Sequence, residues 1–300
     1  MRWFGWFRRR GGGAELVARP AVIGGRVRTR GIPYQMPHDV EEMNRLDFQH
    51  YMLRATLRGN YLAPIGSPGS ILDVGTGTGR WAREMAATFP RANVVGLDIN
   101  LPAVDEASEA RSVDLRPPNY TFVPGNLLEG LPFGDASFDF VHMRALAAAI
   151  PHDRWPFVVG ELLRVTRPGG WVESLEVSTL QRGGPAVDQL MAWLTAAIAR
   201  RGVEFADGAR VGDFLRATGL ARVTARELQM PGRDESGRIR RMLAADCLSL
   251  LAAFRGVMVA LGVASAEQID QAIAATGTAL ASRDVQVVMM LYVTSAQRIR

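Results

Sequence analysis

The residues of this sequence that are best suited to chemistry gather in one glycine-rich turn. Residues 71–81, ILDVGTGTGRW, begin as an apolar run, pass through Asp73 and continue with three closely spaced glycines. This order is typical of a strand, a tight turn and the start of a helix, an arrangement that receives many nucleotides. Glycines in such a turn let the backbone approach a ligand closely. The stretch therefore predicts a nucleotide-binding turn and leaves the nucleotide open.

The spacing of the glycines separates two classes of nucleotide. A dinucleotide fingerprint has the pattern G-x-G-x-x-G, whose third glycine allows close packing of the helix on the strand. Here Gly75, Gly77 and Gly79 give G-x-G-x-G, and Arg80 occupies the position of the third dinucleotide glycine. Asp98 stands 19 residues after Gly79 and can accept both hydroxyls of a ribose, which suits a dinucleotide equally well. The glycine motif is weak evidence by itself.

The ends of the later predicted strands favour an adenosine ligand that is not a dinucleotide. Asn126 follows a strand and can accept from an adenine amino group, while the backbone N–H of Leu127 meets a ring nitrogen. The next strand, FDFVHM, contains Asp139 and is followed by Arg144. Together with the two earlier aspartates, these residues stand at or beside strands in chain order. The set does not make a dehydrogenase.

Strands and helices must alternate to bring these residues together. From residue 70 they do so, which predicts a parallel sheet covered by helices on both faces, with ligands beyond the carboxyl ends of its strands. The predicted strands are 70–74, 93–98, 119–124, 137–142 and 170–177. The predicted helices among them are 79–89, 101–113 and 153–166. Further along we expect helices at 185–201 and 209–218, a strand at 221–229, a helical stretch at 233–284 and a closing strand, VQVVMMLYVTS.

A helix is also expected before the first strand. In the stretch PHDVEEMNRLDFQHYMLRATLRG, Asp39 can cap the amino end while Glu42 reaches back to it. An apolar stripe follows at helical spacing, formed by Met43, Leu46, His50, Leu53 and Leu57. The sequence APIGSPGS then ends the helix.

The charge of the chain is distributed unevenly. Residues 1–32 contain eight arginines and one glutamate, so this glycine-rich tail has a formal charge of +7 and the rest of the chain one of −2. We expect the tail to be solvated and poorly ordered, with contact to nucleic acid or a membrane surface as the alternative. Because the body of the chain is nearly neutral, a nucleic-acid partner is not expected.

Several classes of protein are not expected from the composition. The most apolar stretch, 242–265, is interrupted by Asp246 and Arg255, so no membrane span is predicted. The amino end lacks the apolar segment of a signal peptide. A single cysteine, Cys247, excludes an internal disulfide, and no Cys/His cluster has zinc spacing, so no metal is predicted. With 48% hydrophobic residues in 300, the chain can bury a large core, and we expect a cytoplasmic protein.

Five motifs in order carry a family resemblance. They are LDVGTGTG, VVGLDI, GNLLEGLPF, SFDFVH and RVTRPGGWVE. With these, the chain resembles the class I S-adenosylmethionine-dependent methyltransferases. The flanking stretches YQMPHDVEEMNRLDFQHYMLRATLRGNYLAPI and RWPFVVGELLRVTRPGGWVE resemble a subgroup known from fungal and bacterial secondary metabolism, which includes cluster regulators and small-molecule methyltransferases. The resemblance covers roughly residues 31–296.

The resemblance implies an α/β architecture and a division of the chain. We expect a Rossmann-like sheet of seven strands whose last strand is antiparallel, in a core formed by residues 69–232 and 285–300. Residues 33–68 would form a helical cap, and 233–284 a helical insertion that acts as a substrate lid. Residues 1–32 are the basic tail.

The resemblance also implies S-adenosyl-L-methionine as the cofactor. Its binding residues would be Asp73, Gly75, Thr76, Gly77, Gly79, Asp98, Ile99, Asn126, Leu127 and Met143. Asn126 departs from the aspartate common in the wider family, but its carbonyl can still accept from adenine. The implied substrate is an apolar small molecule, and a homo-oligomer is left open.

Three residues are candidates for catalysis, each with an ordinary structural alternative. His142, at the end of a strand, could act as a base or orient a substrate, or be a hydrogen-bonded strand-end histidine. Glu176 could bind a donor group or pair with an arginine. Tyr34 could cover the cofactor or form a hydrophobic staple. No catalytic dyad is required, because methyl transfer needs a base only where the acceptor must lose a proton first.

The remaining histidines and the apolar insertion have simpler interpretations. His50 is expected to be a satisfied core histidine, and His38 and His152 to be surface residues in turns. The insertion could form one wall of an apolar pocket, through Met242, Leu248, Leu250, Leu251, Phe254 and Met258, although helix packing explains the same spacing.

The leading hypothesis is therefore a methyltransferase that acts on an O, N or C nucleophile of an apolar metabolite. One alternative is a regulatory or binding protein that keeps the cofactor fold with little turnover. Another is an RNA or protein methyltransferase, which would bind nucleic acid in a salt-dependent way through residues 1–32. The last alternative is an NAD-dependent enzyme.

Overall fold

The computed structural model describes the chain over residues 20–23, 26–29, 39–100, 117–178, 184–219, 221–230, 237–281 and 288–299, with side chains from residue 39 onward. The strands of its main sheet are β3 (Ser70–Val74), β4 (Asn93–Asp98), β5 (Tyr120–Pro124), β6 (Phe138–Arg144), β7 (Thr166–Val177), β8 (Ala221–Met230) and β9 (Met289–Arg298). Their order is β5-β4-β3-β6-β7-β9-β8. The first five are parallel, and β9 is antiparallel to both β7 and β8. The predicted seven-stranded sheet with an antiparallel last strand is confirmed.

The described helices agree with the sequence pattern to within a few residues, except at the start of the helical stretch 233–284. They are α1 (Val40–Leu57), α2 (Arg80–Thr88), α4 (Trp155–Val165), α5 (Pro185–Ala199), α6 (Asp207–Ala217), α7 (Arg238–Ala260) and α8 (Ala266–Ala281). The stretch 233–284 contains two helices, α7 and α8, and leads from β8 to β9. The helix predicted at 101–113 lies outside the described residues.

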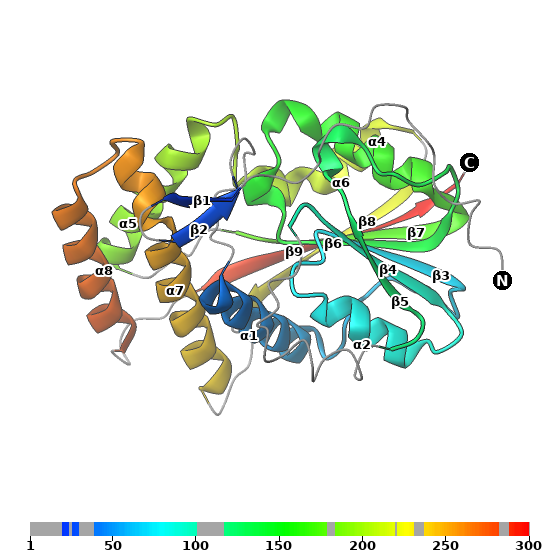
Figure 1. Cartoon of the computed structure of the whole chain (residues 1–300), viewed down its shortest axis with the longest axis horizontal. Coiled ribbons are helices and arrows are strands. Elements are labelled where there is room, and N and C mark those ends of the chain that lie inside the picture. The colour runs from blue at the N-terminus through cyan, green and yellow to red at the C-terminus, as the bar shows by residue number, and fades with distance from the viewer. Residues whose placement is uncertain are drawn as a thin grey trace.

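The helices form layers around the sheet (Figure 1). Helices α4 and α6 cover one face and α2 covers the other, while α5, α7 and α8 gather beyond one end of the sheet. Helix α1 lies between that group and α2, and contacts both α7 and α2. The apolar core is divided into clusters, and one of them unites α5, α7 and α8 with Leu53 of α1 and Leu291 of β9. The end of the sheet that faces α1 and α7 is the one where a ligand is expected.

Helix α7 is long and apolar enough to cross a membrane by length and composition alone. In the structure it packs against α1, α5 and α8, and 44% of its most apolar window is buried. Its buried side chains include Asp246, the residue that interrupts the apolar stretch in the sequence. A core helix of a globular domain accounts for both observations.

Within the basic segment 1–32, the structure describes two short strands. β1 (Pro20–Ile23) and β2 (Arg26–Thr29) pair in an antiparallel hairpin, separate from the main sheet.

Helix α1 begins where the capping pattern predicts. The side chain of Asp39 accepts a hydrogen bond from the backbone N–H of Glu42 at 3.0 Å. The carboxylate of Glu42 in turn accepts two hydrogen bonds from Arg45, at 2.9 and 2.7 Å. The helix ends at Arg58, which adopts a left-handed conformation with φ of 57°. The local signals of the sequence therefore fix both ends of this helix.

A buried ion network joins α1 to α7. Besides Glu42, Arg45 donates to Asp246 of α7 at 2.9 Å, and Gln49 donates to the other oxygen of Asp246 at 3.2 Å. Glu42 and Asp246 are each 2% exposed, and Arg45 is 9% exposed. Burial raises the pKa of Asp246, while Arg45 and Gln49 lower it. Arg45 and Asp246 are 201 residues apart in the chain. Their buried charges thus hold the two helices together.

Arg45→Met should lower the free energy of unfolding by about 3–5 kcal/mol, because it leaves two buried carboxylates without their cation. The matched control is Arg54→Met on the same helix, since Arg54 is half-exposed and pairs with Glu84. An exposed pair of this kind contributes about 1 kcal/mol or less. Urea unfolding of both variants is the measurement, and equal losses would contradict the role assigned to Arg45.

Candidate functional site

A cleft of about 210 Å³ lies at the carboxyl ends of the parallel strands. Its floor is formed by the residues that follow β3, β4, β5 and β6, and its wall by α1 and α7. The described residues that line the floor include Gly75, Thr76, Gly77, Thr78, Asp98, Ile99, Asn100, Gly125, Asn126, Leu127, Arg144, Ala145 and Leu146. The expected ligand edge of the sheet is therefore hollow, and most of the predicted binding residues are there.

The glycine turn needs its glycines for two separate reasons. Gly75 and Gly77 have φ of 71° and 54°, a region that side chains with a Cβ rarely adopt. A Cβ on Gly75 would also stand 2.7 Å from the Leu146 side chain. The backbone N–H groups of Gly75 and Thr76 both donate to the carbonyl of Leu97, at 2.8 and 2.9 Å. The turn is therefore fixed to β4 and presents its backbone to the cleft.

Asp98 stands at the end of β4, facing the glycine turn. One of its carboxylate oxygens accepts from the backbone N–H of Gly77 at 2.9 Å, and the other from Asn100 at 3.0 Å. These bonds hold the carboxylate at the floor of the cleft, in the position that the sequence assigns to a ribose contact. Asp98 therefore connects the turn after β3 with the turn after β4.

Asn126 lines the cleft beyond β5 and caps a short helical turn, η2 (Leu127–Glu129). Its side-chain oxygen accepts from the backbone N–H of Leu128 at 3.0 Å, and its amide donates to Glu129 at 2.9 Å. The orientation of the amide is fixed by these two bonds. Its neighbour Leu127 is buried against the floor, with Ile99 beside it on the cleft surface.

Asp73 and His142 form a buried pair beneath the cleft. Asp73 accepts from the Thr76 hydroxyl at 2.7 Å and lies 2.9 Å from Nδ1 of His142. The His142 ring is 1% exposed and stacks on Trp81 with centroids 3.8 Å apart. Among the described residues, His142 does not line the cleft. The structure thus shows the hydrogen-bonded strand-end histidine that the sequence offered as the alternative to a base.

Met143 is also absent from the described lining of the cleft. Its side chain is fully buried in the cluster between the sheet and α4. The next residue, Arg144, lines the cleft instead. Side chains alternate between the two faces of a strand, and the cleft takes the residue at the very end of β6.

A polar row crosses the sheet under the cleft, and the sequence did not reveal it. Asp73, His142, Glu173 and Ser295 are paired in register across β3, β6, β7 and β9. Glu173 accepts from the backbone of Leu62 at 2.9 Å, from Ala63 at 2.6 Å and from Ser295 at 3.2 Å. Burial raises the pKa of Glu173 and these partners lower it. The row ties the connection between α1 and β3 to the sheet, and only the strand order brings its members together.

Glu176 lies in β7 below the loop that follows β6. It is 1% exposed and accepts from the backbone N–H groups of Leu146 at 3.2 Å and Ala147 at 3.0 Å. Burial is the main cause that raises its pKa to about 7. Glu176 is not among the described residues that line the cleft. It holds the loop whose Leu146 forms part of the cleft floor.

Helices α1 and α7 close the cleft from the side. Residues of α1 that line it are Glu42, Met43, Arg45, Leu46 and Gln49. Among the described residues of α7, only Leu250 and Phe254 line the cleft. They follow Asp246 at intervals of one helical turn. Met258 is buried in the helical cluster instead. Both segments therefore lie at the carboxyl edge, as predicted, but the apolar wall is smaller than the sequence indicates.

Asp47 fastens α1 to the glycine turn. It accepts from the Thr78 hydroxyl at 2.6 Å and from two nitrogens of Arg80, at 3.3 and 2.7 Å. Arg80, the residue that distinguishes the motif from a dinucleotide fingerprint, thus connects the start of α2 to α1.

His50 is fully buried, as predicted for a core histidine. Its Nδ1 lies 3.2 Å from the Arg144 guanidinium, and its Nε2 lies 3.2 Å from Glu84. Burial, and then the charge of Arg144, lower the pKa of His50 to about 4. The neutral imidazole accepts from Arg144 and so orients that side chain at the cleft.

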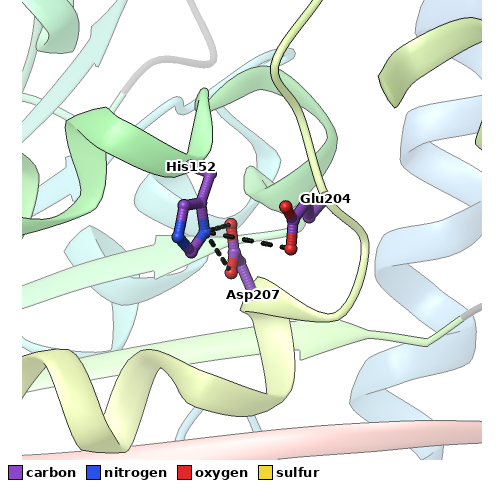
Figure 2. Close-up of side chains that lie close together, drawn as sticks. All are labelled: His152, Glu204 and Asp207. Atoms are coloured by element: carbon purple, nitrogen blue, oxygen red, sulfur yellow. Dashed lines mark hydrogen bonds and ion pairs between the residues drawn. The ribbon is translucent and has the colours of Figure 1, made fainter. Parts of the chain in front are cut away.

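A second polar cluster joins His152, in the turn before α4, to Glu204 and to Asp207 at the start of α6 (Figure 2). Nδ1 of His152 lies 2.9 and 3.0 Å from the two oxygens of Asp207 and 3.9 Å from Glu204. Arg210 stands 3.6 Å from Asp207. These contacts give the buried Asp207 its polar partners, and Phe205, which lies between Glu204 and Asp207 in the chain, lines the cleft. His152 is partly exposed, as expected, whereas His38 and Tyr34 lie outside the described residues.

The comparisons with known proteins agree with this geometry. Residues 71–170 match the model of a methyltransferase domain. The chain is 31% identical over 208 residues to methyltransferase str2 of Strobilurus tenacellus, covering 66% of this chain and 71% of that protein. This chain belongs to the class I S-adenosylmethionine-dependent methyltransferases.

Other relatives of this methyltransferase are also fungal, and one is named a regulator of secondary metabolism. It is 30% identical over 146 residues to the secondary metabolism regulator laeA of Aspergillus fumigatus, covering 48% of this chain and 36% of that protein. It spans about half of methyltransferase pytC of Aspergillus terreus, 47% of its length, at 33% identity over 53% of this chain.

Solved structures show the same fold. The cyclopropane synthase MmaA2 from Mycobacterium tuberculosis matches with a TM-score of 0.50 at 18% identity, over 88% of this methyltransferase and 89% of that chain. A phosphoethanolamine N-methyltransferase from Haemonchus contortus matches with a TM-score of 0.50 at 16% identity, over 86% and 53%.

The pH dependence of stability should report on Glu176. In the folded state its pKa is about 7, raised from 4.5, so the folded protein keeps a proton that the unfolded chain releases. The free energy of unfolding therefore falls as pH rises from 4.5 to 7, by up to about 3 kcal/mol. Glu176→Gln should remove this decline. Denaturant unfolding of both proteins at pH 5 and pH 8 is the measurement, and parallel pH profiles would show that Glu176 is ionised in the fold.

Proposed function

We propose that this chain transfers the methyl group of S-adenosyl-L-methionine to an apolar small molecule, a product of secondary metabolism. One observation carries the proposal. The same cleft contains polar groups suited to adenosine, at Asp98 and Asn126, and the apolar side chains of Ile150, Phe205 and Phe254. The relatives named as methyltransferases and regulators of secondary metabolism support the substrate class.

The floor of the cleft fits the adenosine end of the cofactor. The carboxylate of Asp98 would accept from the ribose hydroxyls, and the apolar sides of Ile99 and Leu127 would cover the adenine ring. The exposed backbone of Gly75 and Gly77 leaves room for the chain that follows the ribose, because a Cβ there would meet Leu146 or approach Leu46. The residues present therefore fit this cofactor.

The chemistry asks little of the protein beyond alignment. When bound, the cofactor supplies an activated methyl group, and the protein aligns the acceptor with it and excludes water. Leu250 and Phe254 of α7, with Met43 and Leu46 of α1, provide an apolar cover over the cleft. With His142 and Glu176 held in internal hydrogen bonds, we assign them to positioning the floor. An acceptor that ionises readily needs no base from the protein.

A second function is favoured by the similarity to laeA, which is named a regulator. In that case the chain would bind the cofactor with little turnover. Incubating the protein with isotopically labelled S-adenosylmethionine and small-molecule extract, followed by mass spectrometry, separates the two. Labelled small molecules support the proposed activity, and cofactor binding without any labelled product supports the regulator.

The protein should bind S-adenosylmethionine or S-adenosylhomocysteine far more tightly than NAD. The G-x-G-x-G turn supports this, because Arg80 is bonded to Asp47 at the point where a dinucleotide pyrophosphate would need a free helix start. Calorimetry with the three ligands measures it. Equal or tighter binding of NAD would overturn the cofactor assignment.

Asp98→Ala should weaken S-adenosylhomocysteine binding by about tenfold or more, since a hydrogen bond to a charged group contributes about 1.5–3 kcal/mol. The matched control is Asp139→Asn, because Asp139 lies at the amino end of β6 and bonds Ser70 and Arg167, away from the cleft. The control should keep the wild-type affinity. Unchanged affinity in a folded Asp98→Ala protein would place the cofactor elsewhere.

A further inference from the structure

Arg144 is unusual among the charged residues of the cleft. The described lining contains four charged side chains, Glu42, Arg45, Asp98 and Arg144. Arg45 is paired with the two carboxylates of Glu42 and Asp246, and Asp98 accepts from backbone N–H groups. Arg144 has one hydrogen-bonding partner within the described chain, the neutral His50, and no carboxylate within ion-pair distance there. The cleft therefore contains one cation whose charge the described residues do not match.

The surroundings of Arg144 keep this cation in place without neutralising it. His50 accepts from one guanidinium nitrogen at 3.2 Å, and Asp73, Glu84 and Asp47 act on Arg144 only from a distance. Burial lowers the pKa of Arg144, although a guanidinium stays charged near neutral pH. A partly buried charge without a counter-ion is costly, and an anion that enters the cleft removes that cost.

The position of Arg144 limits what the anion can be. Arg144 follows Met143, which is paired in register with Val74, so it stands beside Gly75. Ala145, the next residue, has a left-handed φ of 53° and donates its N–H to Leu175 at 2.9 Å, which turns the chain at this point. Arg144, at the end of β6, thus stands on the opposite side of β3 from Asp98 of β4. A ligand whose ribose contacts Asp98 would extend its other end toward Arg144.

We propose that Arg144 is the carboxylate receptor of the cleft. A planar guanidinium with two parallel N–H donors matches a carboxylate in geometry as well as in charge. Two sources can supply this group, and the inference rests on the proposed function in both cases. One is the carboxylate at the amino-acid end of the cofactor, and the other is an acid group on the acceptor, whose remaining surface would face the apolar wall.

Calorimetry with two ligands tests the first source. S-adenosylhomocysteine has the amino-acid carboxylate, whereas 5′-methylthioadenosine keeps the adenosine and lacks that end. Arg144→Gln should weaken S-adenosylhomocysteine binding about tenfold or more and leave 5′-methylthioadenosine binding unchanged. Arg144→Lys, which keeps the charge without the planar pair of donors, should lie between the two. Arg91→Gln changes an exposed arginine that precedes β4 and does not line the cleft, so this control should bind both ligands as the wild type does.

The second source applies if S-adenosylhomocysteine binds Arg144→Gln as tightly as the wild type. Saturation-transfer NMR on the protein saturated with S-adenosylhomocysteine then compares benzoate with benzyl alcohol. A benzoate signal that Arg144→Gln loses, with benzyl alcohol unaffected, would assign the carboxylate to the acceptor.

Two results would refute the inference about Arg144, and a third would refute the proposed function. If both adenosine ligands weaken equally in Arg144→Gln, the arginine only supports the structure and the inference is wrong. If neither the cofactor nor the benzoate arm changes, it is wrong as well. If the wild type binds neither adenosine ligand, the proposed function itself fails, because this result does not depend on any substitution at Arg144.

Discussion

The buried network of Arg45 with Glu42 and Asp246 is the constraint on which the rest of the site depends. A parallel sheet leaves the carboxyl ends of its strands open, and its own helices cover only the two faces. Helix α7 reaches this edge because β8, which it follows, runs parallel to β7 and ends there, whereas α1 precedes β3, which begins at the opposite edge. The charges of Arg45 and Asp246 join them there. Because Arg45 and Glu42 also line the cleft, the same contact that holds the helices together forms part of the wall.

The floor of the cleft is organised by short polar contacts between neighbouring turns. Asp98 holds the turn after β3 through Gly77, Asp73 holds Thr76, and Glu176 holds the loop at Leu146 and Ala147. Each of these carboxylates accepts from backbone or hydroxyl donors that the turns would otherwise leave without a partner. The hydrogen bonds show what these carboxylates hold within the fold. We propose that they position the floor of the cleft and so the alignment of donor and acceptor.

Local patterns in the sequence were sufficient to predict the strands of the sheet and the edge at which a ligand would bind. Apolar runs that end in Asp73 and Asp98 predicted the strands, and the Asp39 cap predicted the start of α1. The prediction was less successful where it depended on which of two consecutive residues at the end of a strand faces the cleft. Met143 was expected at the cofactor, but the pleat turns it into the core and leaves Arg144 at the cleft. Nothing in a single strand shows where its last hydrogen bond lies, so the sequence does not decide between the two.

Contacts between distant segments were beyond the sequence. Asp246 was treated as an interruption of an apolar stretch, and its partner is 201 residues away. The polar row from Asp73 to Ser295 exists only because β9 inserts between β7 and β8. The apolar wall was overestimated for a related reason, since Met258 points into the cluster shared with α5 and α8 rather than to the cleft.

We propose that α1 and α7 cover the cofactor at the carboxyl edge of the sheet. Hydrogen exchange of the full chain, with and without S-adenosylhomocysteine, tests it most directly, because amides that close over a ligand gain protection. We expect slower exchange in α1 around Arg45 and in α7 around Leu250, together with the turn at residues 75–78. Protection confined to the turns of the sheet, with both helices exchanging as in the free protein, would contradict it.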